Sequence, residues 1–192
     1  VTLVDFHNTY ADDLEEYVRD KSQFHFMWGD LNELDYPGKY DCIFLNHLIL
    51  YLENPVETYT RLRSFLNPGG RMITTWGGLL LAENLMTLLC EHAPEEQKKI
   101  KAHYTELKKE MEQREKELKQ VFSEVALHKY PAVLHFETAK EMVDYLEPVA
   151  KKLGVNIADG MSPFEKFLED KFRESGEEFH IVRDGYLYVC RE

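Results

Sequence analysis

Three short apolar segments of the chain end in polar side chains that could hold a ligand or move a proton. Asp5 ends TLVDF, Gly29-Asp30 follows FHFMW, and Asn46 and His47 end DCIFLNH. An acid at the end of a strand can accept two hydrogen bonds from the diol of a ribose, although a helix-start or surface aspartate gives the same pattern. Histidine changes protonation near neutral pH and can accept a proton from a hydroxyl or an amine. These positions predict a ligand-binding edge with His47 as its candidate general base.

The elements around these residues are typical of a parallel sheet. Asp41–Asn46 is almost wholly apolar and does not alternate, as in a central strand that helices cover on both faces. Asn54 and Pro55 predict the start of a helix. Asn67-Pro68-Gly69-Gly70 ends that helix and turns into a buried strand over 71–76. Strands alternating with helices predict an α/β doubly wound sheet, which binds ligands at the carboxyl ends of its strands.

The segment from Pro94 to about His128 is rich in Lys, Glu and Gln and predicts one long helix. Its apolar residues follow a 4-3 rhythm at Ile100, Tyr104, Leu107, Met111, Leu118, Val121 and Val125. So narrow a stripe fits a helical hairpin, a lid over the sheet or a short coiled-coil contact. We favour a solvated helix lying along its own domain. A homodimer contact through the 95–128 helix is the alternative.

The remaining segments predict further helices and a C-terminal hairpin. Helical spacing of apolar residues marks 11–20 and 79–92. Thr138 and Ser162 each stand where a cap would open another helix. Two β-rich runs flank Asp184-Gly185 near the C-terminus, which predicts a tight hairpin turn at that pair.

Composition excludes several classes of function. The chain has 192 residues and a formal net charge of −12, which argues against binding to a nucleic-acid backbone. Its apolar runs fall short of the roughly 18–20 residues that a membrane helix needs, and no secretory leader is recognised. Cys42, Cys90 and Cys190 are scattered, as expected for reduced thiols of a cytoplasmic protein. The histidines show no metal-binding spacing, so no metal site is predicted.

The order of these pieces resembles the class I S-adenosylmethionine-dependent methyltransferases over roughly Val1 to Trp76. The pieces are an acid-ended strand, a strand closing in Gly-Asp, a Tyr-Asp strand with an apolar continuation, and LNPGG before a further strand. The LNPGG turn is the most specific of them, because dehydrogenases with a similar sheet lack it there. The resemblance implies a Rossmann-like sheet with an antiparallel C-terminal hairpin strand and a helical insertion or lid.

The resemblance also implies S-adenosyl-L-methionine as cofactor and methyl transfer to an N, O or C atom of a small-molecule acceptor. Asp5 would bind the ribose, and Asp30 with Leu31 would bind the adenine. Asn46 and His47 would face the methionine part of the cofactor and the acceptor. The residues implied at the substrate mouth are Tyr10 and Tyr51. The predicted single domain, 1–192, divides into a cofactor-binding core over 1–80, a helical lid or insertion over 81–175 and a β-hairpin over 176–192.

One family element has no counterpart in residues 1–192, the glycine-rich motif that contacts the methionine part of the cofactor. Its strand would lie between those ending at Asp5 and Asn46, and its loss would leave two unpaired sheet edges. An upstream segment is the favoured explanation; a strand supplied by a partner and a degenerate relative are the others. The alternative function is accordingly a non-catalytic methyltransferase-like scaffold or regulatory subunit. A nicotinamide-dependent dehydrogenase fits Asp5 but not LNPGG or the closing hairpin.

Overall fold

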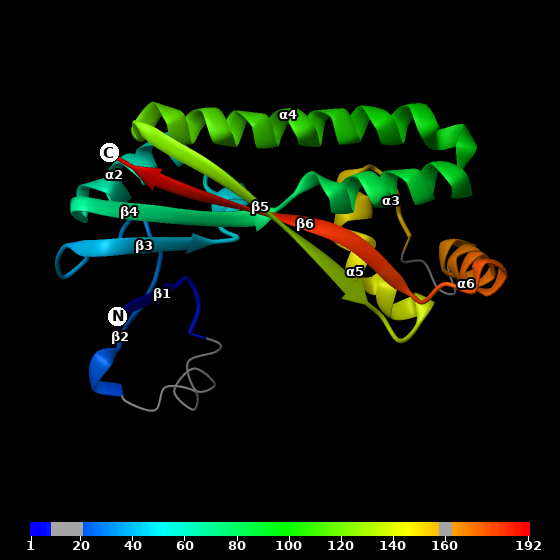
Figure 1. The fold of residues 1–192 in the computed structure, drawn as a ribbon, viewed down its shortest axis with the longest axis horizontal. Helices are drawn as coiled ribbons and strands as arrows, with labels where there is room; N and C mark the ends of the chain where they lie inside the picture. The colour runs from blue at the N-terminus through cyan, green and yellow to red at the C-terminus, as the bar shows by residue number, and fades with distance from the viewer. Residues whose placement is uncertain (9–20, 158–162) are drawn as a thin grey trace.

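The computed structural model describes residues 1–8, 21–157 and 163–192 (Figure 1). Its strands are β1 (Thr2–Asp5), β2 (His25–Trp28), β3 (Tyr40–Asn46), β4 (Leu66–Gly77), β5 (Glu124–His135) and β6 (His180–Arg191). Its helices are α2 (Pro55–Ser64), α3 (Leu79–His92), α4 (Gln97–Val121), α5 (Ala139–Lys152) and α6 (Pro163–Ser175). Short 3-10 helices cover Lys21–Gln23, Ile49–Tyr51 and Pro94–Glu96. The helix predicted over 11–20 and the cap predicted at Ser162 lie outside the described residues.

The strands form two sheets. In the first, β1 and β2 are parallel. The second has the order β3-β4-β6-β5, in which β3 and β4 are parallel and β6 runs antiparallel to both of its neighbours. Helix α2 connects the two parallel strands β3 and β4. The parallel pairs, the connecting helices and the antiparallel strand β6 confirm the predicted α/β class.

Several predicted element starts are found where the sequence placed them. Helix α2 begins at Pro55, with Asn54 as its N-cap residue. Helix α5 follows Thr138, whose Oγ1 accepts a hydrogen bond from the backbone N of Glu141 at 3.1 Å. The Glu141 carboxylate accepts in turn from the backbone N of Glu137, the residue before the cap, at 2.9 Å, an arrangement close to a capping box. A side-chain cap therefore fixes the start of α5, whereas Asn54 makes no side-chain cap hydrogen bond and α2 begins at Pro55, whose ring fixes φ.

The turn LNPGG is a bulge at the start of β4. The register pairs Tyr40 with Leu66 and then Cys42 with Arg71, so that residues 67–70 loop out opposite a single residue of β3. Gly69 has a φ of 77°, a left-handed conformation that favours glycine. The turn therefore sets the register in which β4 pairs with β3.

The hairpin predicted at Asp184-Gly185 is wrong, because β6 runs through both residues without turning. Its antiparallel partners are β4 and β5, and β5 lies in the segment predicted as a helical lid or insertion. Asp184 holds the start of α3, since its Oδ1 accepts a hydrogen bond from the backbone N of Leu80 at 2.9 Å. A Cβ on Gly185 would lie 2.0 Å from the ring of Tyr130, so glycine serves a close approach here and not a turn.

The long helix is shorter than predicted. Helix α4 ends at Val121, where Phe122 adopts an extended conformation, and β5 begins at Glu124. Val125 fits the helical 4-3 rhythm but pairs with Cys190 in the sheet. The 81–175 segment therefore contributes an edge strand to the sheet as well as helices.

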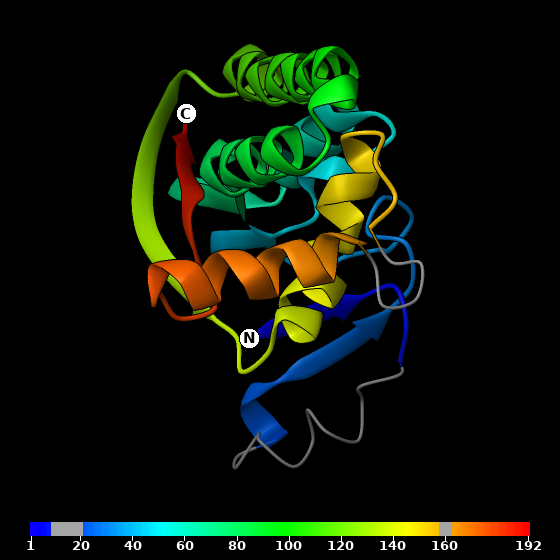
Figure 2. The same cartoon turned by 90° about the vertical axis from the view of Figure 1, so that its right-hand side faces the viewer.

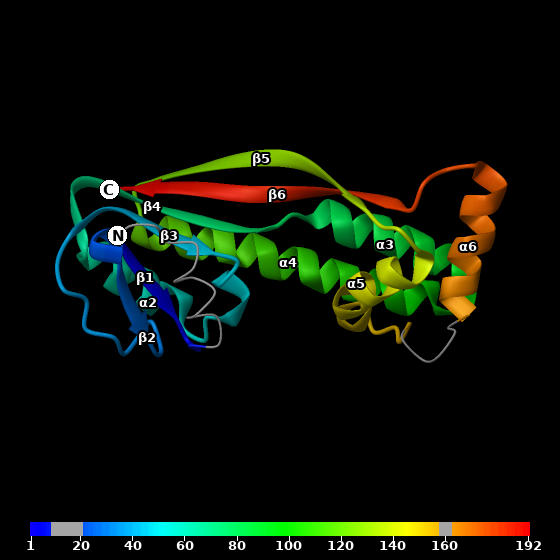
Figure 3. The same cartoon turned by 90° about the horizontal axis from the view of Figure 1, so that it is seen from below.

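The main core lies on one face of the four-stranded sheet. It joins sheet residues to α2 and α4 through Leu45, Met72, Trp76, Tyr188, Cys190, Tyr59, Leu62, Met111, Leu118 and Val121. Figures 2 and 3 show α4 running along this side of the sheet. The rings of Trp76 and Tyr188 stack at 4.3 Å between centroids inside it. A second cluster packs α3 against α5 and α6 through Leu85, Leu89, Met142, Leu146, Phe164 and Leu168.

Strand β3 lies at an edge of its sheet and not, as predicted, in a covered centre. Leu45 faces the core, but the neighbouring Phe44 side chain, on the opposite face, is 62% exposed. Residues apolar on both faces of a strand are expected where both faces are covered. Within the described residues, the cover of β3 is complete on the Leu45 face alone.

We expect Cys190 to resist thiol reagents in the folded protein. Burial raises the pKa of the Cys190 thiol to about 12, whereas Cys42 and Cys90 are only partly buried. A pKa about three units above the ordinary value leaves roughly a thousandfold less reactive thiolate at pH 8. Peptide mass spectrometry after labelling should find Cys42 and Cys90 modified, and Cys190 modified only in denaturant. Equal labelling of all three cysteines in the folded chain would contradict this packing.

Candidate functional site

The ends of β1 and β2 bring the two predicted acidic positions next to each other. The parallel register places Asp5 opposite Trp28, and the backbone N of Gly29 donates to the Asp5 carbonyl oxygen at 2.9 Å. Asp30 follows immediately. The Asp5 side chain is exposed, and its Oδ1 accepts from the backbone N of His7 at 2.9 Å. Two carboxylates thus stand at the carboxyl ends of neighbouring parallel strands.

The segment after β2 is a tight turn built on Asp30. Its Oδ1 accepts from the backbone N of Asn32 at 2.7 Å, and its carbonyl oxygen accepts from the backbone N of Glu33 and of Leu34 at 3.0 and 3.1 Å. Gly29, with a φ of 140°, lets the chain enter this turn. The partly buried Leu31 packs against the main core. The turn therefore fixes the backbone on either side of Leu31.

The end of β3 presents Asn46 and His47 beside β4. Asn46 Oδ1 accepts from Thr75 Oγ1 at 3.2 Å, and the backbone N of His47 donates to the Thr75 carbonyl oxygen at 2.9 Å. Both predicted side chains are exposed. His47 has a φ of 53°, the left-handed region that non-glycine residues rarely adopt. Sequence reasoning missed Thr75, although its place one strand over, level with Asn46, follows from the register.

Of the two residues predicted at the substrate mouth, the structure describes Tyr51 but not Tyr10. Tyr51 ends the 3-10 helix Ile49–Tyr51 and is 81% exposed, while Ile49 anchors the same turn in the core. Tyr10 lies outside the described residues. The role predicted for each tyrosine stays a prediction.

The two sheets touch where β1 and β3 begin. Thr2 Oγ1 and Tyr40 Oη, from the first residues of the two strands, are 3.2 Å apart. Figure 1 shows β1 beneath β3, and Figure 3 shows the two strands diverging. Among the described residues no backbone hydrogen bonds pair β1 with β3. Strands that pair directly lie about 4.8 Å apart. The facing edges of β1 and β3 are thus unpaired where the family resemblance places the strand of the glycine-rich motif.

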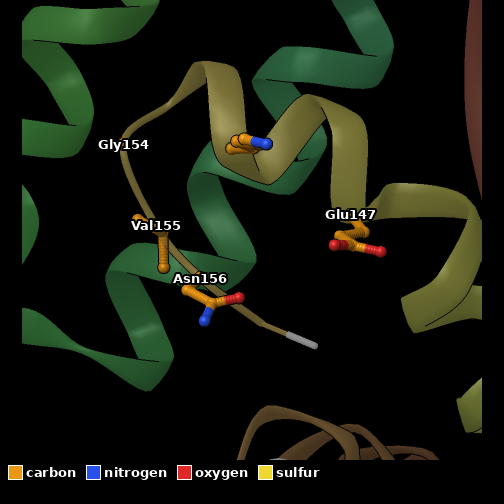
Figure 4. Close-up of a pocket in the computed structure, with 5 residues that line it drawn as sticks. Glu147, Gly154, Val155 and Asn156 are labelled. Atoms are coloured by element: carbon orange, nitrogen blue, oxygen red, sulfur yellow. The ribbon is translucent and has the colours of Figure 1, made fainter. Parts of the chain in front are cut away.

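A depression at the end of α5 lies away from these residues. Its lining residues are Glu147, Lys151, Gly154, Val155 and Asn156, and Figure 4 shows Glu147 on α5 and Gly154, Val155 and Asn156 on the segment that follows. None of the predicted site residues belongs to this lining. The predicted site is therefore an open edge formed by strand ends.

Residues 1–74 match the family model described as a methyltransferase domain. The matched segment runs from β1 into β4 and contains Asp5, Asp30, Asn46 and His47. This match agrees with the resemblance of the same segment to the class I S-adenosylmethionine-dependent methyltransferases.

Solved structures align with the chain at low identity. The YcgJ protein of Bacillus subtilis gives a TM-score of 0.48 at 13% identity and covers 100% of this chain and 82% of that one. A phosphoethanolamine N-methyltransferase 2 of Haemonchus contortus, solved with phosphomonomethylethanolamine and S-adenosylhomocysteine, gives 0.48 at 14%, with coverages of 100% and 43%. An S-adenosylmethionine-dependent methyltransferase of Clostridium acetobutylicum gives 0.37 at 15%, with coverages of 44% and 37%. No protein of curated function matches the chain.

Among the described helices, none combines the length and the apolar composition that crossing a bilayer requires.

Proposed function

We propose that this chain binds S-adenosyl-L-methionine across the carboxyl ends of β1, β2 and β3 and takes part in methyl transfer to an N, O or C atom of a small-molecule acceptor. The observation that carries the proposal is the pair of carboxylates, Asp5 and Asp30, on neighbouring parallel strand ends inside the segment that matches the methyltransferase domain. A ligand with a diol at one end and an amino-bearing base at the other fits this pair of acceptors, since carboxylates accept hydrogen bonds from both groups.

Each residue has a stated part in this proposal. Asp5, exposed at its strand end, would accept from the ribose hydroxyls, and Asp30 would accept from the adenine amino group. Asn46, held by Thr75, would donate through its amide toward the methionine part. When bound, the cofactor supplies an electrophilic methyl group. The chain's contribution to the transfer is to align the acceptor with that group and to keep it there.

We propose further that one more strand completes this site by pairing with β1 and β3. Two observations support it: both facing edges are unpaired among the described residues, and Phe44 on β3 is 62% exposed. An exposed, apolar, unpaired strand is an aggregation hazard that proteins normally cover. The same observations favour the second candidate function, a non-catalytic methyltransferase-like subunit that docks on a partner. The cytoplasmic location and a homodimer through the 95–128 segment stay predictions, and the buried stripe of α4 already packs on its own chain.

The experiment is a transfer assay with methyl-labelled S-adenosylmethionine and a panel of phenols, amines, carboxylates and carbon acids. Label in an organic product that depends on this chain supports the enzyme. Cofactor binding without product from any member of the panel favours the non-catalytic subunit. Label in no product and no cofactor binding would contradict the proposal.

We propose His47 as the residue that accepts the proton of a hydroxyl or amine acceptor. His47→Asn removes the base but keeps a residue that tolerates the left-handed backbone. The variant is expected to lower the transfer rate about 100-fold, with the dissociation constant of S-adenosylhomocysteine unchanged. An unchanged rate would mean that transfer needs only proximity and in-line alignment.

A further inference from the structure

Helix α2 holds the loop that joins β2 to β3. This 30–36 loop (Asp30–Tyr36) carries the carboxylate and the apolar side chain that the proposed function assigns to adenine. Arg61 and Thr58, one turn apart on α2, both reach it. The hydrogen bonds of the Asp30 turn fix the loop only from within. The contacts from α2 fix it relative to the rest of the domain.

Arg61 is the main residue by which α2 holds the 30–36 loop. Its Nη1 donates to the Leu31 carbonyl oxygen at 2.6 Å, and its Nη2 donates to the Leu34 carbonyl oxygen. One guanidinium thus binds two backbone positions three residues apart. Its Cζ also lies 5.4 Å from the ring centroid of Tyr36 and 5.6 Å from that of Phe65. Cation–π contact with two rings holds the guanidinium in place.

Two neighbouring side chains reinforce Arg61. Tyr36 Oη donates to the same Leu31 carbonyl oxygen at 2.9 Å, and its ring meets Phe65 edge-on at 5.0 Å. Burial raises the pKa of Tyr36, so its hydroxyl stays protonated and able to donate. Thr58 Oγ1 donates to Asn32 Oδ1 at 2.6 Å. Leu31, next to Asp30, therefore has a carbonyl oxygen bound by two donors from outside the turn.

We propose that Arg61 is a positioning residue for the purine end of the cofactor, which it serves by holding the 30–36 loop in one conformation. The inference rests on the proposed function, because it takes Asp30 and Leu31 as the residues that meet the adenine. Arg61 does not touch the ligand itself. It fixes the carbonyl groups of Leu31 and Leu34. The loop then loses less conformational entropy when the purine binds.

The planar fork of arginine is what this role requires. A lysine ammonium at position 61 would carry the same charge but is a single point donor on a flexible stem. It could hold the carbonyl of Leu31 or that of Leu34, but it could not reproduce the fixed two-carbonyl geometry. Arg61→Lys should therefore recover only part of what Arg61→Gln loses.

The test combines amide hydrogen exchange with cofactor binding on the intact chain. In Arg61→Gln, exchange at Asn32, Glu33 and Leu34 should accelerate at least tenfold, because these amides donate within the turn that Arg61 holds. The dissociation constant of S-adenosylhomocysteine, measured by calorimetry, should rise about tenfold. Arg61→Lys should lie between this variant and the wild type in both measurements.

The matched control is Arg63→Gln on the same helix. Arg63 also donates to a backbone carbonyl, that of Val121 at 2.8 Å, and pairs with Glu192, and none of its hydrogen bonds within the described residues reaches the 30–36 loop. This variant should leave the exchange of the three loop amides and the binding constant unchanged, whatever it does to the melting temperature. A loss of affinity that follows global stability would affect both arginine variants alike.

The outcomes separate this inference from the proposed function. If the wild type binds S-adenosylhomocysteine and Arg61→Gln binds it equally well, the positioning role is overturned while the proposed function stands. Unchanged exchange at the loop amides of Arg61→Gln would also overturn it. If the wild type does not bind the ligand at all, the proposed function fails, and the inference fails with it. Faster loop exchange together with weaker binding, absent from Arg63→Gln, supports the positioning role.

Discussion

Asp5→Ala is expected to weaken the binding of S-adenosylhomocysteine by roughly 100-fold. The carboxylate is exposed at the end of β1, in a position to accept from two ribose hydroxyls at once. A hydrogen bond to a charged group contributes about 1.5–3 kcal/mol, so two at the lower figure correspond to roughly 100-fold in the dissociation constant. Isothermal calorimetry on the intact chain measures this directly.

Asp41→Ala is the matched control for Asp5→Ala. Asp41 is also an exposed acid on a parallel strand, but it stands near the start of β3 and accepts from Asn67 Nδ2 at 2.8 Å. The Asp41→Ala substitution removes one negative charge, as Asp5→Ala does, but near the start of a strand and not at its end. The control should bind the ligand as the wild type does. Equal affinities for Asp5→Ala and the wild type would remove Asp5 from the site.

Leu118→Ala is expected to lower the free energy of unfolding by about 2–5 kcal/mol. Leu118 is fully buried between α4 and the sheet, and the substitution removes apolar contact and leaves a cavity that the surrounding core fills only in part. Urea unfolding followed by circular dichroism gives the difference. The apolar stripe of α4 packs against its own chain, so Leu118→Ala should leave the oligomeric state unchanged.

Val133→Ala provides the comparison for Leu118→Ala. Val133 is apolar and lies in a regular element, but its side chain is 48% exposed, so its loss should change the free energy of unfolding by about 0.5 kcal/mol or less. A small effect of Leu118→Ala on unfolding, combined with dissociation of a larger species, would show that the α4 stripe packs between chains. That outcome would contradict the arrangement of α4 on its own sheet.

Local signals in the sequence predicted the elements over the first third of the chain well. Pro55 and LNPGG act through backbone dihedrals and hydrogen bonds within a few residues, so their effect is visible in the sequence. The alignment of Asp5 with Asp30 followed from the rule that parallel strands end at one edge. The apolar composition of β3 alone predicts a central strand, whereas its unpaired edge followed from the absence of the glycine-rich motif in residues 1–192.

Long-range packing set the features that the sequence reasoning missed. Asp184-Gly185 has the composition of a hairpin turn, but the glycine serves the approach of Tyr130 and the aspartate caps α3. Val125 continues the helical rhythm and yet pairs with Cys190 in the sheet. Arg61 gave no signal at all, because one polar residue on a helix is typical of a solvated face. Its two carbonyl partners lie 27 and 30 residues away in the chain.

The central claim, that this chain holds S-adenosylmethionine at its strand ends, is tested most directly by thermal unfolding with and without S-adenosylhomocysteine. A ligand at about 100 times its dissociation constant stabilises the folded state by roughly 2.7 kcal/mol. For a domain of this size the midpoint should then rise by roughly 5–10 °C, and the rise should be lost in Asp5→Ala. A cooperative transition whose midpoint does not move with the ligand would contradict the claim.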